Sequence, residues 1–473
     1  MNVSRRFFLA GAFGALGAFN GCRFMPGIVS GKPKLKFGVV SDVHIRLGLD
    51  AKAPLKSHDT TTLQHTFEWF RDQGVDAVMI AGDMADMGLV KELEAVAQTW
   101  WKVFPNDKAP DGRTVTRLFV TGNHDWEGFT YSSAYIKKIF SKLSADELKK
   151  EYLRTNYKAN WERIWKEEFN PIWMKEVKGY KFVGAHWVAD RCRGAEERGI
   201  VGVEEFFAQH AKEFDPRQPF FYFQHPHPKN TVCGPKQWGQ DDGRSARALT
   251  PFSNAIAFSG HSHTPLTDEQ DIWQGAFTSI GTASLRYSGP YDARQGMLVS
   301  VCNDHVRIER REFIRDNSLG DDWVIPLPAA EAKPFAFKTR AKALGAPAFA
   351  AGAQVSLVCD RNVLVPEKPK PNQKQTKGLF KLKFPTATAA KARANRYDIQ
   401  MVNRVGQVIR EELGLRAPDY AYEPTHKLRT APVEKKIAFS AVPAGTTEVG
   451  FLVTPVSAHG ERGVPLATPF VKL

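Results

Sequence analysis

Five short polar clusters, each directly after an apolar run, contain the residue types that could do chemistry. In chain order they are Asp42-Val43-His44, Gly82-Asp83, Gly122-Asn123-His124-Asp125, His225 and Gly260-His261-Ser262-His263. Taken singly each cluster is weak, because a strand-end aspartate is usually a turn residue and paired histidines usually lie on a surface. Together they bring carboxylates, imidazoles and one amide, which suit borderline divalent ions such as Mn, Fe, Zn or Ni. The ordered set predicts a metal centre.

The segments that precede these clusters predict the elements that must position them. Strands are expected at 35–40, 75–81, 117–120, 181–185, 220–224, 255–258, 277–280 and 297–301, and helices at 60–72, 89–103 and 203–214. This alternation of strand and helix predicts a layered α/β fold. Such folds place their sites at the carboxyl ends of the strands. The fold therefore predicts that the five clusters meet.

The segment from about 130 to 175 departs from this alternation, because it is helical in pattern, charged and rich in aromatic residues. Trp161, Trp165 and Trp173 lie there among lysines and glutamates. We interpret it as a solvated helical insertion with a few packed aromatic side chains. The alternative is a lid or cap that faces the substrate.

The C-terminal third predicts a second, smaller domain. Around 322–353 the composition shifts to proline and alanine with little periodicity, which is typical of a linker. We place the linker at 336–353 and the first domain at 32–335. Short strand-like runs at 355–359, 379–384, 397–402 and 447–456 then predict an all-β sandwich over 354–473. This region resembles a fibronectin type III domain in length and in its 397–402 strand. It departs from that family in having no tryptophan beyond Trp323.

The first 31 residues predict an export signal. Arg5 and Arg6 are followed by Phe7-Phe8-Leu9 and a short apolar stretch, a sequence that resembles a twin-arginine signal. The residues before Cys22 resemble a lipoprotein cleavage box, which implies acylation at Cys22. The alternative is an incidental cysteine in a discarded peptide. The expected location is the periplasm or the cell surface, with a lipid anchor if Cys22 is acylated.

Composition limits the remaining classes. The 473-residue chain is 42% hydrophobic and 25% charged, as expected of a globular protein. Its net charge of +14 fits either an anionic partner or general solubility. Basic and acidic residues alternate without a long basic block, which argues against nucleic-acid binding. Five scattered cysteines without a C-x-x-C exclude a disulfide-dense scaffold and a cysteine zinc site, and leave one isolated disulfide open. The oligomeric state cannot be read from these features.

The five clusters, in their order, resemble the calcineurin-like metallophosphoesterases, and the resemblance extends over about residues 35–313. It implies a centre of two divalent ions with one bridging carboxylate. The ligands it implies are Asp42, His44 and His263 for the first ion, Asn123, His225 and His261 for the second, and Asp83 between them.

The resemblance also implies a mechanism, in which a hydroxide held between the ions attacks phosphorus in line. His124 would stabilise or protonate the leaving oxygen as an imidazolium, and Asp86 would accept a hydrogen bond from His124. His227 and Arg244 are candidates for substrate contact, with a proline-flanked turn and an exposed loop as their alternative interpretations. Asp125 is interpreted as a structural cap.

The function that follows is an exported phosphoester hydrolase for phosphodiesters or phosphomonoesters of small or lipid-derived molecules. His44 stands where the purple acid phosphatase branch has tyrosine, and the His124-Asp125 pair is more similar to phosphodiesterase members. Two alternatives stay open: a phosphoprotein phosphatase, and a non-catalytic surface binding protein whose sandwich domain binds the partner.

Overall fold

A computed structural model describes residues 32–47, 58–128, 144, 146, 150–190, 197–234, 237–288, 293–328, 345–364, 377–390, 392–418 and 431–473. The predicted export signal, Cys22 and part of the expected helical insertion lie outside these residues.

The first sheet of the α/β region has seven strands in the order β14-β13-β12-β1-β2-β3, with β15 also paired to β13. Their bounds are β1 (Leu35–Val40), β2 (Ala77–Ala81), β3 (Thr116–Val120), β12 (Gln295–Val301), β13 (His305–Glu312), β14 (Asn317–Ser318) and β15 (Trp323–Pro326). Strands β1, β2 and β3 are parallel, and β12 runs antiparallel to β1. The parallel strands end level with one another, because Val40 pairs with Ile80 and Ala81 with Val120.

The second sheet has six strands in the order β10-β11-β9-β8-β5-β4. Their bounds are β4 (Ile172–Val177), β5 (Tyr180–Ala185), β8 (Phe220–Gln224), β9 (Ala255–Ser259), β10 (Ile272–Gln274) and β11 (Thr278–Gly281). The four central strands are parallel, and the two edge strands are antiparallel to their neighbours. A separate hairpin joins β6 (Trp187–Asp190) to β7 (Glu197–Ile200).

The two sheets pack face to face around Phe37 of β1. Its ring centroid lies 5.2 Å from that of Phe182, 4.8 Å from that of Phe221 and 6.0 Å from that of Phe258, all three on strands of the second sheet. All four side chains are fully buried. Edge-to-face contacts of this kind stabilise a core beyond the area that they bury. This aromatic contact holds the two sheets in register with one another.

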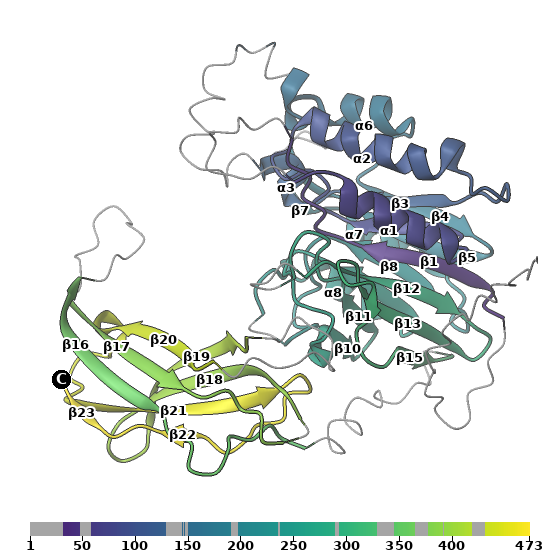
Figure 1. Cartoon of the computed structure of the whole chain (residues 1–473). Coiled ribbons are helices and arrows are strands. Elements are labelled where there is room, and N and C mark those ends of the chain that lie inside the picture. Colours follow the sequence, from purple (N-terminus) through teal and green to yellow (C-terminus); the bar gives the residue numbers. More distant parts are fainter. Residues whose placement is uncertain are drawn as a thin grey trace, which may run out of the picture. The chain divides into compact units, whose positions relative to one another are not determined.

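Helices cover the outer face of each sheet. The α-helices with described bounds are α1 (Thr61–Asp72), α2 (Val90–Val103), α3 (Asn123–Glu127), α6 (Tyr157–Trp165), α7 (Val203–His210) and α8 (Arg244–Leu249). Figure 1 shows α1 and α2 over the sheet that contains β1 and β3. Phe70 of α1 fills the space above Gly38, where an added Cβ would lie 2.5 Å from its ring. On the second sheet, Phe207 of α7 contacts Tyr222 and Phe220 of β8.

The aromatic side chains of the expected insertion pack into the core where the structure describes them. Trp161 and Trp165 of α6 are fully buried, and the ring of Trp165 lies 5.0 Å from that of Phe119 on β3. Trp173 lies on β4, half-buried against Phe223. A sheet strand therefore occupies the end of the range that we expected to be helical.

The C-terminal region is an all-β sandwich, as predicted. One sheet contains β16 (Ser356–Leu364), β17 (Lys377–Phe384) and β20 (Val433–Ala438). The other contains β18 (Ala394–Val402), β19 (Val408–Arg416), β21 (Glu448–Ser457), β22 (Leu466–Ala467) and β23 (Val471–Lys472). Phe380 and Phe451 join the two sheets with ring centroids 5.1 Å apart. Tyr397 lies in this core, and its hydroxyl accepts a hydrogen bond from Ala387 N at 2.9 Å.

Strand β13 was not predicted, because its charged residues conceal the alternation that marks a strand. Arg310 and Glu312 are buried. Arg310 is held there by an ion pair to Glu269 at 2.9 Å and by the ring of Trp323, 4.4 Å from its guanidinium carbon. The buried face of β13 thus carries charges that tertiary partners neutralise.

Two further observations concern the described residues. None of their helices is long and apolar enough to cross a membrane. Of their cysteines, Cys233 and Cys359 are free thiols.

Replacing Phe37 by alanine should destabilise the two-sheet region by about 3–5 kcal/mol, because it leaves a cavity between the sheets. Denaturant unfolding followed by tryptophan fluorescence measures the change. Ile314→Ala is the control, since Ile314 is 49% exposed, and it should lie within about 0.5 kcal/mol of the parent. Equal midpoints for both variants would contradict the assigned role of Phe37.

Candidate metal centre

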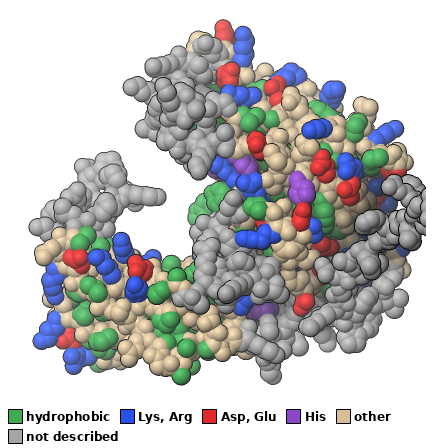
Figure 2. Space-filling model, in the orientation of Figure 1, with side chains coloured by type: hydrophobic (Ala, Val, Ile, Leu, Met, Phe, Trp, Pro, Cys, Tyr) green, Lys and Arg blue, Asp and Glu red, His purple; other side chains and the backbone are tan. Residues whose placement is uncertain are grey.

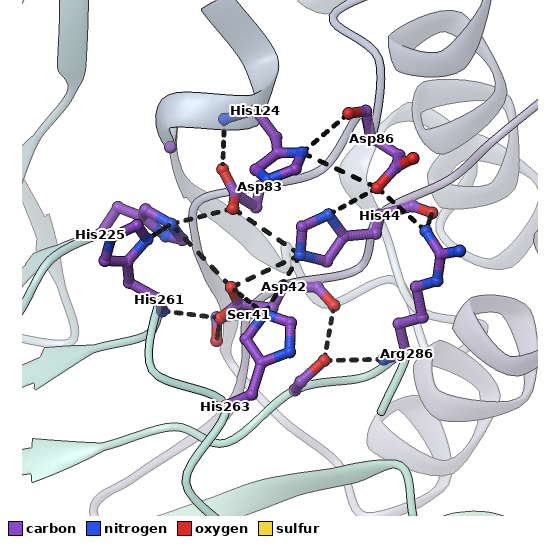
Figure 3. Close-up of polar contacts among 12 residues, drawn as sticks. Ser41, Asp42, His44, Asp83, Asp86, His124, His225, His261, His263 and Arg286 are labelled. Atoms are coloured by element: carbon purple, nitrogen blue, oxygen red, sulfur yellow. Dashed lines mark hydrogen bonds and ion pairs between the residues drawn. The ribbon is translucent and has the colours of Figure 1, made fainter. Parts of the chain in front are cut away.

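The five polar clusters meet at the carboxyl ends of strands from both sheets. Asp42, Asp83 and Asn123 follow β1, β2 and β3, while His225 and His261 follow β8 and β9. Figure 3 shows Asp42, Asp83 and the histidines pointing toward one another from these loops. The face-to-face packing of the sheets therefore brings together residues more than 200 positions apart.

The first group of side chains contains Asp42, His44 and His263, whose potential ligand atoms lie within 4.8 Å of one another. His263 Nε2 lies 2.9 Å from Asp42 Oδ1 and 3.2 Å from His44 Nε2. His44 Nε2 lies 3.7 Å from Asp42 Oδ1. Two imidazole nitrogens and one carboxylate oxygen thus face a common point.

The second group contains Asp83, His225 and His261, whose potential ligand atoms also lie within 4.8 Å of one another. Asp83 Oδ2 lies 3.0 Å from His225 Nε2, and His225 Nε2 lies 3.1 Å from His261 Nδ1. The other ring nitrogen of His225 donates to the backbone oxygen of Ala81 at 2.8 Å. That hydrogen bond selects the tautomer whose Nε2 lone pair faces the group.

An unsatisfied buried oxygen tests whether these residues fit metal ions. Asn123 Oδ1 is buried and accepts no hydrogen bond. Buried polar atoms without a partner are rare and call for a ligand. Carboxylate, amide and imidazole donors together match borderline divalent ions. The residues fit such ions.

The backbone of the centre is strained. Asp42, His44, Asp83, His261 and His263 all have left-handed φ values, between 49° and 71°. Such values are uncommon outside glycine, and each costs on the order of 1–3 kcal/mol. Residues held in this way cluster at functional sites, because the surrounding structure must impose them.

Two glycines allow the close approach of the loops. Gly82 has φ 89°, and a Cβ there would lie 2.5 Å from the His225 ring. A Cβ at Gly260 would lie 2.3 Å from Asp42 Oδ2. A side chain at either position would push a carboxylate or an imidazole out of the centre.

Asp86 accepts the expected hydrogen bond from His124, but through its backbone oxygen. His124 Nδ1 donates to that oxygen at 2.8 Å, and the Asp86 carboxylate is 3.7 Å away. Burial lowers the pKa of His124, although the Asp83 carboxylate opposes this effect. His124 also falls within a third cluster of possible ligands, together with His44 and Asp83.

The Asp86 carboxylate instead faces His44. It lies 3.0 Å from His44 Nδ1 and 2.9 Å from Arg286 Nη1, and it also contacts Arg46. Carboxylates that hold the second nitrogen of a ligating histidine fix its ring orientation and raise its basicity. Asp86 is therefore placed to orient His44.

Sequence reasoning missed the residues that hold Asp42. Ser41 Oγ donates to Asp42 Oδ2 at 2.5 Å and accepts from Thr282 Oγ1 at 2.6 Å. Ser284 Oγ donates to the Asp42 backbone oxygen at 3.0 Å. Thr282 and Ser284 are the first and third residues after β11, so the same strand-end rule that found the ligands would have found them.

The histidine pKa values reflect these charges. Burial lowers the pKa of His44, but the Asp42 and Asp86 carboxylates outweigh it and raise the value to about 10. Burial also lowers the pKa of His225, but the Asp83 and Asp42 carboxylates outweigh this effect and raise the pKa to about 9. For His261, burial and the neighbouring His225 lower the pKa to about 3.

The two predicted substrate residues, His227 and Arg244, both contact other side chains of the chain. His227 is buried, with Nδ1 2.7 Å from Ser259 Oγ and Nε2 2.7 Å from Ser262 Oγ. Because Ser262 separates His261 from His263, this histidine supports their loop. Arg244 is the exposed first residue of α8 and pairs with Asp242 at 3.0 Å.

Asp125 connects two of the loops. Its carboxylate accepts from Ala85 N at 2.7 Å and from Gly122 N at 2.8 Å. Burial, together with the charge of Asp83, raises its pKa to about 7. These contacts agree with a structural cap.

Comparison with known families identifies this part of the chain. Residues 35–265 match the family model of the calcineurin-like phosphoesterases. The chain therefore contains a calcineurin-like metallophosphoesterase domain and is a phosphoric ester hydrolase. A search of curated proteins found no match.

Several solved structures match part of this chain. A dimetal phosphatase from Danio rerio is 13% identical, with 63% of this chain and 100% of that chain covered and a TM-score of 0.40. A purple acid phosphatase from yellow lupin seeds is 13% identical, with 62% and 55% covered and a TM-score of 0.36. A predicted phosphoesterase from Streptococcus pneumoniae is 12% identical, with 63% and 99% covered and a TM-score of 0.27.

Replacing Asp86 by asparagine should weaken metal binding by about 10–100-fold, because His44 loses the carboxylate that orients it. Chelator competition measures the affinity. Asp242→Asn is the matched control, since Asp242 is exposed and pairs with Arg244, and its affinity should equal that of the parent. An unchanged affinity in Asp86→Asn would contradict the orienting role.

Metal affinity should rise with pH. In the metal-free protein His44 and His225 hold protons at neutral pH, with pKa values of about 10 and about 9. Coordination requires the neutral ring, so each must release a proton, and the apparent affinity should rise about tenfold per pH unit below these values. Competition assays between pH 6 and 8.5 test this, with His65→Gln as an exposed-histidine control. A flat profile would show that these rings do not ligate.

Proposed function

We propose that the protein is an exported hydrolase of phosphoesters that uses two divalent ions, drawn from Mn, Fe, Zn or Ni. The observation that carries the proposal is the position of Asp83 between the two groups of side chains. Its Oδ2 atom lies 3.0 Å from His225 Nε2 in one group and 3.7 Å from His44 Nε2 in the other. A single carboxylate so placed would bridge two ions and screen their repulsion.

The ions would supply a hydroxide nucleophile at neutral pH and neutralise charge on the phosphoryl oxygens. The first would be held by Asp42, His44 and His263, and the second by Asn123, His225 and His261. Asp83 would serve both.

The chain contributes His124 beside these ligands. The backbone N–H of His124 donates to Asp83 Oδ1 at 2.8 Å, which fixes its position. Its side chain is 25% exposed, so a substrate reaches it from solvent. His124 would hydrogen-bond the leaving oxygen and deliver a proton to it. The lowered pKa of His124 makes its protonated form a stronger acid. It also makes a smaller fraction of His124 protonated at neutral pH.

The substrates would be phosphodiesters or phosphomonoesters of small or lipid-derived molecules. The twin-arginine sequence at Arg5 and Arg6 supports export to the periplasm or the cell surface, and Cys22 supports a lipid anchor. The C-terminal sandwich would be a fibronectin type III-like accessory domain.

Metal-loaded protein should hydrolyse bis-p-nitrophenyl phosphate, p-nitrophenyl phosphate or both. Asp83→Asn should lower kcat by at least about 1000-fold, since both ions lose a ligand. His124→Ala should lower it by about 100–10,000-fold, the usual contribution of an acid–base group. Release of p-nitrophenolate measures both rates.

The control is His65→Ala, at an exposed histidine that pairs with Asp316; its rate should match that of the parent. Diester turnover would assign a phosphodiesterase, and monoester turnover alone a phosphatase. Two bound ions without turnover of either ester would overturn the hydrolase proposal. Absence of bound metal would overturn the centre itself.

A further inference from the structure

Two exposed aromatic rings border the metal centre, one on each histidine of the Gly260-His261-Ser262-His263 loop. The Trp238 ring stacks on His261, with centroids 4.5 Å apart and planes 21° apart. The Tyr287 ring lies 4.4 Å from that of His263. Their exposed fractions are 68% and 45%. Among the described residues, the one other exposed aromatic side chain is Phe470, in the C-terminal sandwich.

The chain holds the backbone next to Trp238 in place. The backbone oxygen of the next residue, Gly239, accepts a hydrogen bond from His227 N at 2.8 Å. Gly239 has φ 91°, and a Cβ there would lie 2.9 Å from the His261 ring. The loop that carries Trp238 therefore lies directly against the loop of the proposed ligands.

Tyr287 is held by the segment that follows β11. Its backbone N–H donates to Ser284 Oγ at 3.1 Å. The preceding residue, Arg286, is fixed by its ion pair with Asp86 at 2.9 Å. Both rings thus rest on the same framework that positions Asp42 and His44.

Support of the histidines alone does not account for this exposure. If the Trp238 ring served only to orient His261, its other face could be covered by the chain. The core tryptophans Trp161 and Trp165 are covered on both faces in this way. Trp238 instead contacts His261 with one face and leaves most of its surface in water. An aromatic ring offers a flat apolar surface on which another planar ring stacks.

We propose that Trp238 and Tyr287 form a stacking site for a planar ring in the organic part of the substrate. The site rests on the proposed function, because the phosphoryl group would lie at the ions beside His261 and His263. The substrate class would be ring-bearing phosphoesters, either aryl esters or nucleotides. Aryl esters and nucleotides both present a planar ring beside a phosphoryl group, and binding measurements distinguish between them.

The test measures binding rather than turnover, on the metal-loaded full chain. Calorimetry would compare phenylphosphonate, methylphosphonate and adenosine monophosphate. We expect phenylphosphonate to bind about tenfold more tightly than methylphosphonate, since stacking on an aromatic side chain supplies the difference. In Trp238→Ala this ratio should fall toward one, and Tyr287→Ala should lower it less, because Tyr287 is less exposed. Ile314→Ala, at a remote exposed apolar side chain, should keep the parent ratio.

Adenosine monophosphate tests the nucleotide source. Tighter binding than phenylphosphonate, lost in Trp238→Ala, would assign a nucleobase, and weaker binding would assign an aryl group. Equal affinities for the phenyl and methyl ligands in the parent would overturn the stacking site. The stacking site would also be overturned if Trp238→Ala weakened the binding of phenylphosphonate and methylphosphonate equally. That result would show that Trp238 only supports His261. Ring-selective binding without hydrolysis of any ester would refute the hydrolase and retain the site.

Discussion

The Asp83 carboxylate is the interaction on which the rest of the centre depends. It follows β2, yet its oxygens contact groups from three other loops: His124 N after β3, His225 after β8 of the opposite sheet, and His44 after β1. A buried carboxylate costs several kcal/mol unless it is paired. Those loops must therefore converge on it, and the sheets that bear them must hold a fixed relative position.

Two features of the fold maintain this convergence. Phe37 and its three phenylalanine neighbours fix the sheets face to face, and the level ends of β1, β2 and β3 bring their loops to one edge. Left-handed backbone at Asp42, Asp83 and His261 opposes this arrangement. The extensive buried core outweighs that strain, which lets the ligands keep conformations that isolated loops would abandon.

Outside the ligands lies a layer of residues that orient them. Asp86 faces His44, His227 braces the loop of His261 and His263 through Ser262, and Ser41 holds Asp42. Each contact fixes a ring or a carboxylate in one orientation. In a centre where a displacement of 1 Å is costly, such contacts matter as much as the ligands. Beyond this layer the chain exposes Trp238 and Tyr287, which give the centre an apolar border.

On the face shown in Figure 2, basic and acidic side chains are interspersed rather than gathered into one basic patch.

The sequence by itself determined the layered α/β fold, the C-terminal sandwich and the residues gathered at the centre. It did so because apolar runs such as 35–40 and 255–258 mark buried strands, and polar groups directly after parallel strands must share an edge. Strand β13 escaped prediction because its buried charges Arg310 and Glu312 depend on partners distant in sequence. Tertiary structure alone decided that Asp86 turns its carboxylate to His44 rather than to His124, and that His227 is buried. It also set Trp238 on His261. These outcomes depend on side-chain directions and on contacts between loops more than 20 residues apart, and local pattern carries no information about either.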